Sequence, residues 1–256
     1  MLGLPSQVRA CLFDLDGVLT KTAVVHAAAW KEMFDDFLRA WSERTGAPFV
    51  PFDAHDDYGR YVDGRPRLDG TRAFLRSRGI ELPEGGPDDP PDTWTIHGLG
   101  NRKQALVLAR LAQGRIEIYE GSVRYVRAAR AAGLSTAVVS SSANTRQVLE
   151  AVGITDLFDT RIDGLVAEER GLAGKPAPDT FLAGAEALGA EPASAAVFED
   201  ALAGVEAGRA GGFAVVVGVD RVGQADELRR HGADVVVRDL SELLDEGQIE
   251  GEGQGT

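Results

Sequence analysis

VRACLFDLDGVLT, residues 8–20, is the stretch that decides the fold. Its first part, residues 8–13, is a short and nearly continuous apolar run that ends at Asp14, which is typical of a strand buried on both faces. Similar apolar runs recur at residues 136–139, 195–198, 213–219 and 234–237. We expect these runs to form the strands of one sheet.

Helix-period stretches separate the apolar runs in the second half of the chain. Their last apolar residues come shortly before Gly133, Gly153 and Gly189. Glycine is the expected helix stop, because it adopts the left-handed conformation without a steric penalty. From about residue 115 onward, helices and strands alternate, which predicts a parallel sheet with helices on both faces. The expected fold class is therefore α/β, a doubly wound parallel sheet with a Rossmann-like core.

Residues 21–114 break this alternation and predict helices only. One face of the first helix is marked by Trp30, Met33, Phe34, Phe37, Leu38 and Trp41. Shorter helices are expected near residues 68–75 and 101–111, and the loop PEGGPDDPPDT at 83–93 is too rich in proline and glycine for regular structure. We expect an inserted helical cap at 21–114, a core formed by 1–20 and 115–243, and a disordered tail at 244–256.

Composition excludes several classes of function. The 256 residues carry a formal net charge of -13, and nucleic-acid binding needs a basic face that displaces counterions. No secretory leader is recognised at the N-terminus, and no apolar run approaches the roughly 18–20 residues of a membrane-spanning helix. The single cysteine, Cys11, cannot form an internal disulfide. We therefore expect a cytoplasmic protein that binds neither nucleic acid nor membrane, as a monomer or weak homo-oligomer.

Polar residues cluster where the predicted strands end. In open parallel sheets, ligands bind beyond the carboxyl ends of the strands. Each polar group has a common structural explanation on its own, such as a turn, a helix cap or a solvated acidic pair. Their occurrence together at one edge favours a catalytic site. The residues are Asp14 and Asp16 after the first strand, Ser140 after the second run, Lys175 in GKPAPD at 174–179, and the pair Glu199-Asp200.

These residue types suit phosphoryl transfer. A carboxylate attacks a phosphate dianion only when cationic groups neutralise the phosphoryl oxygens and hold the reactants in line. Mg²⁺ prefers oxygen ligands, which Asp14 and Asp200 would supply. Lys175 would offset negative charge on Asp14, while Ser140 and backbone amides at the next helix start would cradle the phosphate. The pattern predicts a magnesium-dependent enzyme with Asp14 as the nucleophile.

Four motifs in this order resemble the haloacid dehalogenase superfamily, and the resemblance covers nearly the whole chain. They are Asp14-Leu-Asp16-Gly17-Val18-Leu19-Thr20, Ser140, Lys175 and Glu199-Asp200. Residues 140–144 and 175–179, with Thr22, His26 and Trp30, look like the β-phosphoglucomutase branch, which carries a helical cap. The resemblance implies that Asp16 is the general acid and base. It also implies that the backbone carbonyl of Asp16 joins Asp14, Glu199 and Asp200 around Mg²⁺.

The resemblance also implies a set of substrate-binding residues. Arg67 would grip the distal phosphate of a phosphorylated sugar, Lys103 would contact sugar or phosphate, and His26 would couple cap closure to the position of Asp16. Thr22, Ser142 and Asn144 complete the set. For Arg65 and Arg102 we favour the simpler interpretation of solvated cap charges, and for Trp30 that of cap core.

Three functions remain open from the sequence. The leading one interconverts β-glucose 1-phosphate and glucose 6-phosphate through a bisphosphate; the alternative is a phosphatase of sugar phosphates or small phosphomonoesters, with water as acceptor. A catalytically silent binding module is disfavoured, because Asp14, Asp16 and Lys175 are all present. Two features depart from the branch, namely Lys21 at a usually acidic position and the long loop at 83–93.

Overall fold

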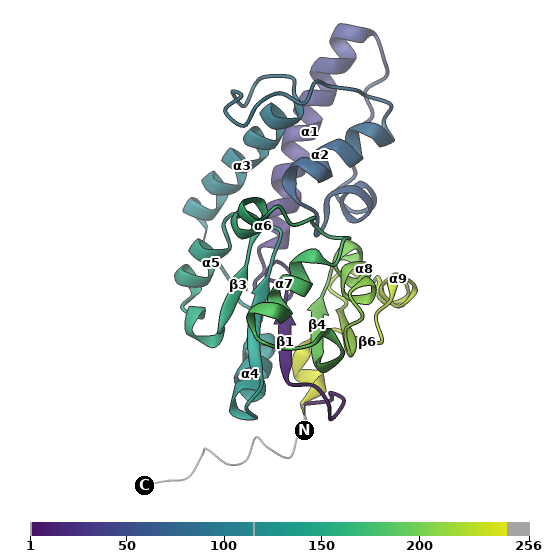
Figure 1. The fold of residues 1–256 in the computed structure, drawn as a ribbon. Helices are drawn as coiled ribbons and strands as arrows, with labels where there is room; N and C mark the ends of the chain where they lie inside the picture. Colours follow the sequence, from purple (N-terminus) through teal and green to yellow (C-terminus); the bar gives the residue numbers. More distant parts are fainter. Residues whose placement is uncertain (1, 115, 245–256) are drawn as a thin grey trace.

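The computed structural model describes residues 2–114 and 116–244. Six strands form one sheet in the order β3-β2-β1-β4-β5-β6, and every neighbouring pair is parallel. The strands are β1 (Ala10–Phe13), β2 (Ser135–Val139), β3 (Thr160–Ile162), β4 (Ala195–Glu199), β5 (Val215–Val219) and β6 (Val235–Val237). The predicted α/β class is confirmed, with β1 at the centre between β2 and β4 (Figure 1).

Helices cover both faces of the sheet, which is why the central strands are mostly apolar. Alternate residues of β1 enter two different buried clusters, Cys11 and Phe13 one and Ala10 and Leu12 the other. One face packs on α4 (Glu120–Ala131) and α5 (Thr145–Val152), and the other on α7 (Asp179–Ala187), α8 (Leu202–Ala210) and α9 (Ala225–His231). The short α6 (Gly164–Arg170) follows β3. Gly153 ends α5 with φ 69°, in the left-handed conformation expected of it.

A third buried cluster lies outside the sheet, among the helices of residues 21–114. These are α1 (Ala23–Thr45), the π-helical turn η1 (Tyr58–Val62), α2 (Arg67–Ser77) and α3 (Ile96–Gln113). Trp30, Phe34 and Phe37 of α1 are buried in this cluster, as their spacing predicts. A separate apolar core is what a domain needs to fold as a unit. We call these helices the cap, and the domain bounds 21–114 stay a prediction.

Three elements differ from the sequence-based expectation. The strand β3 was absent from the apolar runs, because it has only three residues and two of them are partly exposed. The helix α3 starts earlier than residue 101, since the Thr95 side chain accepts a hydrogen bond of 2.9 Å from the Gly98 amide. The turn η1 was not expected.

Of the tail 244–256, only Leu244 belongs to the described residues, and it packs against the sheet cluster.

The helices of residues 21–114 lie over the carboxyl ends of the strands (Figure 1). The two parts touch closely, because Ser141 Oγ donates a hydrogen bond of 2.6 Å to the Gly64 carbonyl. A Cβ atom at Gly174 would lie 2.0 Å from Cγ of Pro66. Residues 64–66 therefore contact the loops that carry Ser141 and Gly174 at the sheet edge.

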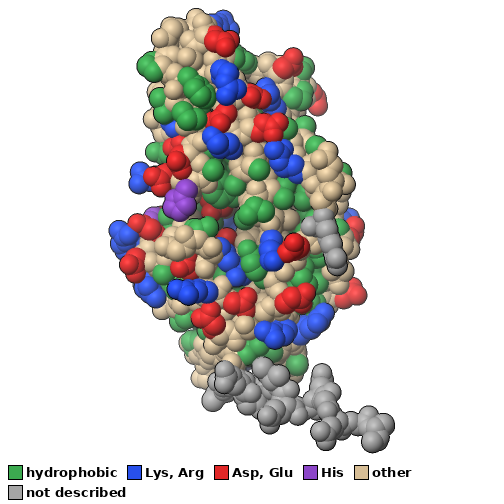
Figure 2. Space-filling view, turned by 180° about the vertical axis from the view of Figure 1, so that it is seen from behind, with side chains coloured by type: hydrophobic (Ala, Val, Ile, Leu, Met, Phe, Trp, Pro, Cys, Tyr) green, Lys and Arg blue, Asp and Glu red, His purple; other side chains and the backbone are tan. Residues whose placement is uncertain are grey.

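The surface mixes charges of both signs. On the face seen in Figure 2, lysine and arginine side chains are interspersed with aspartate and glutamate rather than gathered in one area. Among the described residues, no helix combines the length and the apolar character needed to cross a membrane.

Candidate active site

Asp14 and Lys175 form the centre of the site. Asp14 directly follows β1, and its amide donates to the Phe198 carbonyl at 3.0 Å. The Lys175 ammonium donates to Asp14 Oδ1 at 2.6 Å, to Glu199 Oε1 at 2.7 Å and to the Val139 carbonyl at 3.0 Å. Burial acts to lower the pKa of Lys175, but the two carboxylates outweigh it and hold the pKa above its usual value. Lys175 is therefore a permanent cation beside Asp14.

The acidic residues of the edge offer a cation site. Oxygen atoms of Asp14, Glu199 and Asp200 lie within 4.8 Å of one another, and all three side chains are buried. Burial, with Asp63 and the neighbouring carboxylates, raises the pKa of Asp200 well above its usual value. One lysine cannot neutralise this cluster, whereas a hard divalent cation with oxygen ligands would. The residues present therefore fit Mg²⁺.

Gly17 allows the acidic cluster to be this compact. Its φ is 96°, and a Cβ atom there would lie 1.8 Å from Asp200 Oδ2. Only glycine combines this backbone conformation with so close an approach. The glycine of the first motif thus determines the distance between the loop that carries Asp16 and the carboxylate of Asp200.

The Asp16 side chain is held by the start of the cap rather than by the acidic cluster. Thr22 Oγ1 donates a hydrogen bond to Asp16 Oδ1. The Thr22 hydroxyl also lies 2.6 Å from that of Thr20, whose own hydroxyl donates to the Leu15 carbonyl at 3.1 Å. Thr22 is buried, and it does not line the cavity described below. This chain of hydroxyl groups orients the carboxylate.

His26 of α1 and Lys103 of α3 form the next contact beside Asp16. The Lys103 ammonium lies 3.0 Å from His26 Nδ1, and His26 Nε2 lies 3.7 Å from Asp16 Oδ1. Burial lowers the pKa of Lys103 to about 7. Burial and the charge of Lys103 lower the pKa of His26 to about 4, so His26 is neutral near pH 7. A neutral imidazole accepts a hydrogen bond from Lys103 at Nδ1 and directs its Nε2–H toward Asp16.

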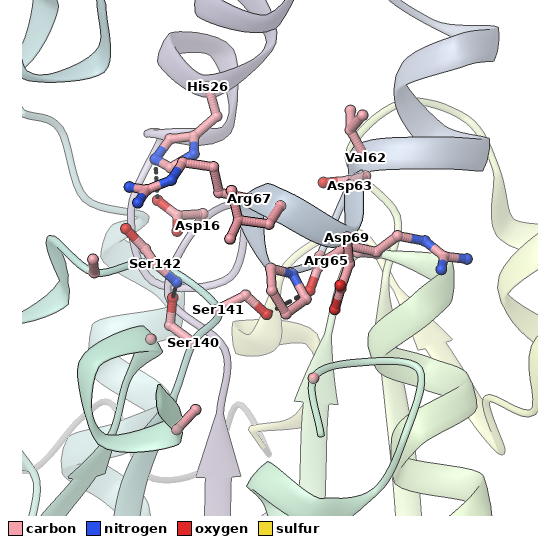
Figure 3. A pocket seen from close by; sticks show the side chains of 18 of the residues that line it. Asp16, His26, Val62, Asp63, Arg65, Arg67, Asp69, Ser140, Ser141 and Ser142 are labelled. Carbon is pink, nitrogen blue, oxygen red and sulfur yellow. Dashed lines mark hydrogen bonds and ion pairs between the residues drawn. The ribbon is translucent and has the colours of Figure 1, made fainter. Parts of the chain in front are cut away.

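A cavity of about 390 Å³ lies between the sheet edge and the cap, and Figure 3 shows how several of its residues face one another. Asp14 and Ser140 line it from the sheet edge, and Arg67 and Lys103 line it from the cap. The Nε atom of Arg67 is buried without a hydrogen-bond partner in the described part of the chain. An unpaired cationic donor that lines a cavity suits an anionic ligand.

Two further predicted residues lie on the loop after β2. Ser142 lines the cavity, and its amide donates to Ser140 Oγ at 3.1 Å. Asn144 does not line the cavity, but its amide donates to Ser142 Oγ at 3.2 Å. Its side-chain Oδ1 accepts a hydrogen bond of 2.7 Å from Gln104 of α3. Asn144 therefore ties the loop after β2 to the cap.

Three other basic residues considered from the sequence have different surroundings. Arg65 lines the cavity, although its sequence context favoured a solvated position. Arg102 lies outside the cavity lining and donates to Asp36 at 2.5 Å, as a surface charge pair does. Lys21 forms an exposed pair with Glu117 at 2.6 Å and so joins the two linkers between core and cap. Lys21, which stands at a usually acidic position of the branch, therefore pairs with Glu117.

Sequence reasoning missed three residues around the site. Arg221 donates to the Gly17 carbonyl at 2.7 Å and lies 3.5 Å above the Tyr119 ring, which supports the loop after Asp16. Tyr58 and Asp63 line the cavity from the cap, and the Tyr58 hydroxyl donates to the Asp63 carboxylate. The sequence carried one signal for Asp63, namely its place in DGRPR beside the arginines that were considered.

Comparison with known proteins agrees with this geometry. A family model described as haloacid dehalogenase-like hydrolase matches residues 8–212, so the chain belongs to this family of enzymes. A β-phosphoglucomutase of Mycobacterium tuberculosis (strain CDC 1551 / Oshkosh) is 59% identical over 247 residues, which cover 95% of this chain and 94% of the relative. Within the superfamily, the chain is therefore of the β-phosphoglucomutase-like branch.

Solved structures share the fold. A β-phosphoglucomutase structure from Clostridium difficile matches with a TM-score of 0.72 and 23% identity, over 93% of this chain and 94% of that one. A hydrolase structure from Pseudomonas syringae matches with a TM-score of 0.74 and 24% identity, over 93% and 97%. At these identities the likeness supports the architecture of the chain and leaves its substrate to other evidence.

Proposed function

We propose that this chain is a magnesium-dependent β-phosphoglucomutase, which interconverts β-glucose 1-phosphate and glucose 6-phosphate through a bound bisphosphate. The observation that carries the proposal is the single cavity with an anion-binding group at each side. Asp14 and Ser140 line it from the sheet edge, and Arg67 lines it from the cap with an unpaired donor. A bisphosphate needs two such sites, whereas hydrolysis of a monoester needs one. The relative with 59% identity bears the name of the same activity.

In the proposed mechanism, an oxygen of Asp14 attacks the phosphorus atom and the bond from phosphorus to the sugar oxygen breaks. Asp16 gives a proton to the departing oxygen. It then takes a proton from the acceptor hydroxyl as that oxygen attacks phosphorus and the bond from phosphorus to Asp14 breaks. Lys175 and Ser140 hold the phosphoryl oxygens during both transfers. The Thr22 hydroxyl, bonded to Asp16, keeps this carboxylate directed at the reacting oxygen.

Asp14, Asp200 and the backbone carbonyl of Asp16 would hold Mg²⁺, with Glu199 behind them. When bound, the cation supplies charge neutralisation for the phosphoryl oxygens and the Asp14 carboxylate. Glu199 already accepts hydrogen bonds from Lys175 and, at 2.9 Å, from the Ala201 amide. Its proposed role is therefore to fix Lys175 and the edge of the cation site.

Arg67 would bind the distal phosphate, and Lys103 would contact the sugar or that phosphate. His26 acts through its position between Lys103 and Asp16, and Ser142 and Asn144 support the phosphate-side loop. We also propose that residues 21–114 close as a cap over the core, 1–20 and 115–243, and exclude water. The cytoplasm as location, and a monomer or weak homo-oligomer, belong to the same proposal.

The same covalent chemistry with water as acceptor would make the chain a sugar-phosphate phosphatase, the class of reaction that the family's description names. A coupled assay separates the two functions. The protein is given β-glucose 1-phosphate, Mg²⁺ and a trace of glucose 1,6-bisphosphate, and glucose 6-phosphate is measured against free phosphate. We expect glucose 6-phosphate to account for nearly all product, and Asp14→Asn to form none. Stoichiometric phosphate without glucose 6-phosphate would reject the mutase.

A further inference from the structure

Asp63 is a carboxylate that the cap presents to the cavity without a cationic partner. It follows η1 and lines the cavity, and Figure 3 shows it on the side away from Asp16 and His26. The Tyr58 hydroxyl and the Gly64 amide donate to its side chain. Among residues 2–114 and 116–244, no ion pair joins it to a lysine or arginine. A carboxylate in such a place is costly to keep unless a ligand supplies hydrogen-bond donors.

The position of Asp63 is fixed relative to the phosphate end of the site. The next residue, Gly64, accepts the 2.6 Å hydrogen bond from Ser141, which adjoins Ser140. Gly64 has φ 69°, and a Cβ atom there would lie 2.9 Å from the Cβ of Ala201. Asp63 therefore lies at a set distance from the proposed phosphate cradle in the arrangement of residues 64 and 141 seen here.

The charges near Asp63 decide which kind of ligand group it can meet. Burial, together with Glu199 and Asp16 as negative neighbours, raises the pKa of Asp63 to about 7. Another anion, such as a phosphate group, would be repelled there. A neutral donor is favoured, and a sugar ring bound between two phosphate sites offers several hydroxyl groups of that kind. In its charged form, Asp63 would accept a stronger hydrogen bond than a neutral group does.

We propose that Asp63 is a specificity-determining residue that accepts a hydrogen bond from a ring hydroxyl of the substrate, and that Tyr58 holds it in position. The inference rests on the proposed function, because it assumes a sugar phosphate in the cavity. It gives the cap a role in selecting the sugar as well as in binding the distal phosphate. A site built around such an acceptor rejects ligands that lack the matching hydroxyl.

The test combines variants of the full-length protein with substrates that lack one hydroxyl. Asp63→Asn, Tyr58→Phe and wild type are compared on β-glucose 1-phosphate, on its 2-, 3- and 4-deoxy forms, and on p-nitrophenyl phosphate. For wild type, loss of the recognised hydroxyl should lower kcat/KM by about 10- to 100-fold, the range for a hydrogen bond to a charged group. For Asp63→Asn, loss of the same hydroxyl should lower kcat/KM by a several-fold smaller factor. Loss of either other hydroxyl should lower kcat/KM equally in wild type and Asp63→Asn. Tyr58→Phe should shift the same position in the same direction, to a smaller extent.

Asp56→Asn is the matched control, since this cap aspartate is exposed and lies outside the cavity lining. It should show the wild-type pattern on every substrate. Equal costs of all three deletions in wild type and Asp63→Asn would overturn the inference. So would an equal loss of Asp63→Asn on p-nitrophenyl phosphate and on the sugar phosphate, or a raised Mg²⁺ requirement without any change in hydroxyl preference.

These outcomes are distinct from failure of the proposed function. If wild type releases phosphate from β-glucose 1-phosphate and forms no glucose 6-phosphate, the mutase is rejected. The deoxy substrates are then compared by their rates of phosphate release. This comparison still tests whether Asp63 selects the sugar. If Asp63→Asn does not fold, the Tyr58→Phe series carries the test, because removal of one hydroxyl leaves the ring in place.

Discussion

Lys175 and Asp14 are 161 residues apart in the chain, yet the lysine ammonium lies 2.6 Å from the carboxylate oxygen Oδ1 in a buried site. The loop after α6 brings Lys175 to the end of β1, and its ammonium also contacts Glu199 at 2.7 Å. One cation is thus shared between two carboxylates. The contact gives Lys175 a structural role in addition to the catalytic role that we propose for it.

We predict that Lys175→Met abolishes phosphorylation of Asp14 and also destabilises the fold. Removing the lysine leaves two buried carboxylates without their cation, which costs about 3–5 kcal/mol for a broken buried pair. Urea unfolding of the protein in EDTA would measure the loss of free energy. Lys21→Met is the matched control, because the Lys21–Glu117 pair is exposed and its loss should be much smaller. If the two variants unfold at the same urea concentration, the buried pair does not stabilise the fold.

Most of the sheet could be predicted because its strands are buried on both faces. The residues of β1 and β4 are fully buried, so each appears in the sequence as a continuous apolar run. The edge strand β3 could not be recognised in this way, since Thr160 and Arg161 are only partly buried. The turn η1 also lacked a signal, because its five residues mix glycine and arginine with aromatic side chains.

The site was predictable to the extent that it follows strand ends. Parallel strands end at the same edge, so polar residues after β1, β2 and β4 had to come near one another. The structure places Asp14, Lys175 and Glu199 in contact, while the roles assigned to them stay predictions. The contacts of Asp63 and Arg221 depend on how the cap and a distant loop pack, and no local pattern records such packing.

Replacing Asp14 or Asp16 with asparagine should have different effects on phosphorylation of the enzyme. We predict that Asp14→Asn forms no covalent phosphoenzyme, because the attacking carboxylate oxygen is gone. Asp16→Asn should still be phosphorylated slowly by a reactive donor such as acetyl phosphate, which needs little help from a general acid. Mass spectrometry of the intact protein after rapid quenching would detect the added phosphoryl group. Wild-type turnover by Asp14→Asn would disprove the mechanism.

Arg67 should matter for the bisphosphate more than for a small ester. We predict that Arg67→Ala lowers kcat/KM for β-glucose 1-phosphate by about 10- to 100-fold, the range for one charge-assisted hydrogen bond. Hydrolysis of p-nitrophenyl phosphate should fall far less, because this substrate has no distal phosphate. Arg102→Ala is the control, since Arg102 pairs with Asp36 outside the cavity lining. Equal losses on both substrates would remove Arg67 from a distal phosphate site.

Lys103 should make the stability of the ligand-free protein depend on pH. Burial lowers its pKa from 10.5 to about 7 in the folded state, so between these values the unfolded chain binds more protons than the folded one. The contribution of Lys103 to the free energy of unfolding therefore rises with pH between about 7 and 10.5. It is lowest below pH 7.

We predict that wild type gains stability relative to Lys103→Met as the pH is raised from 7 to 9. The gain is limited to about 1.4 kcal/mol per pH unit for one group. Urea unfolding at pH 7, 8 and 9 would measure it, with Lys31→Met as control because Lys31 lies on a partly exposed face of α1. The Lys31→Met curve should run parallel to that of wild type. A constant difference between Lys103→Met and wild type over this range would show that Lys103 keeps its proton in the folded protein, as a lysine in water does.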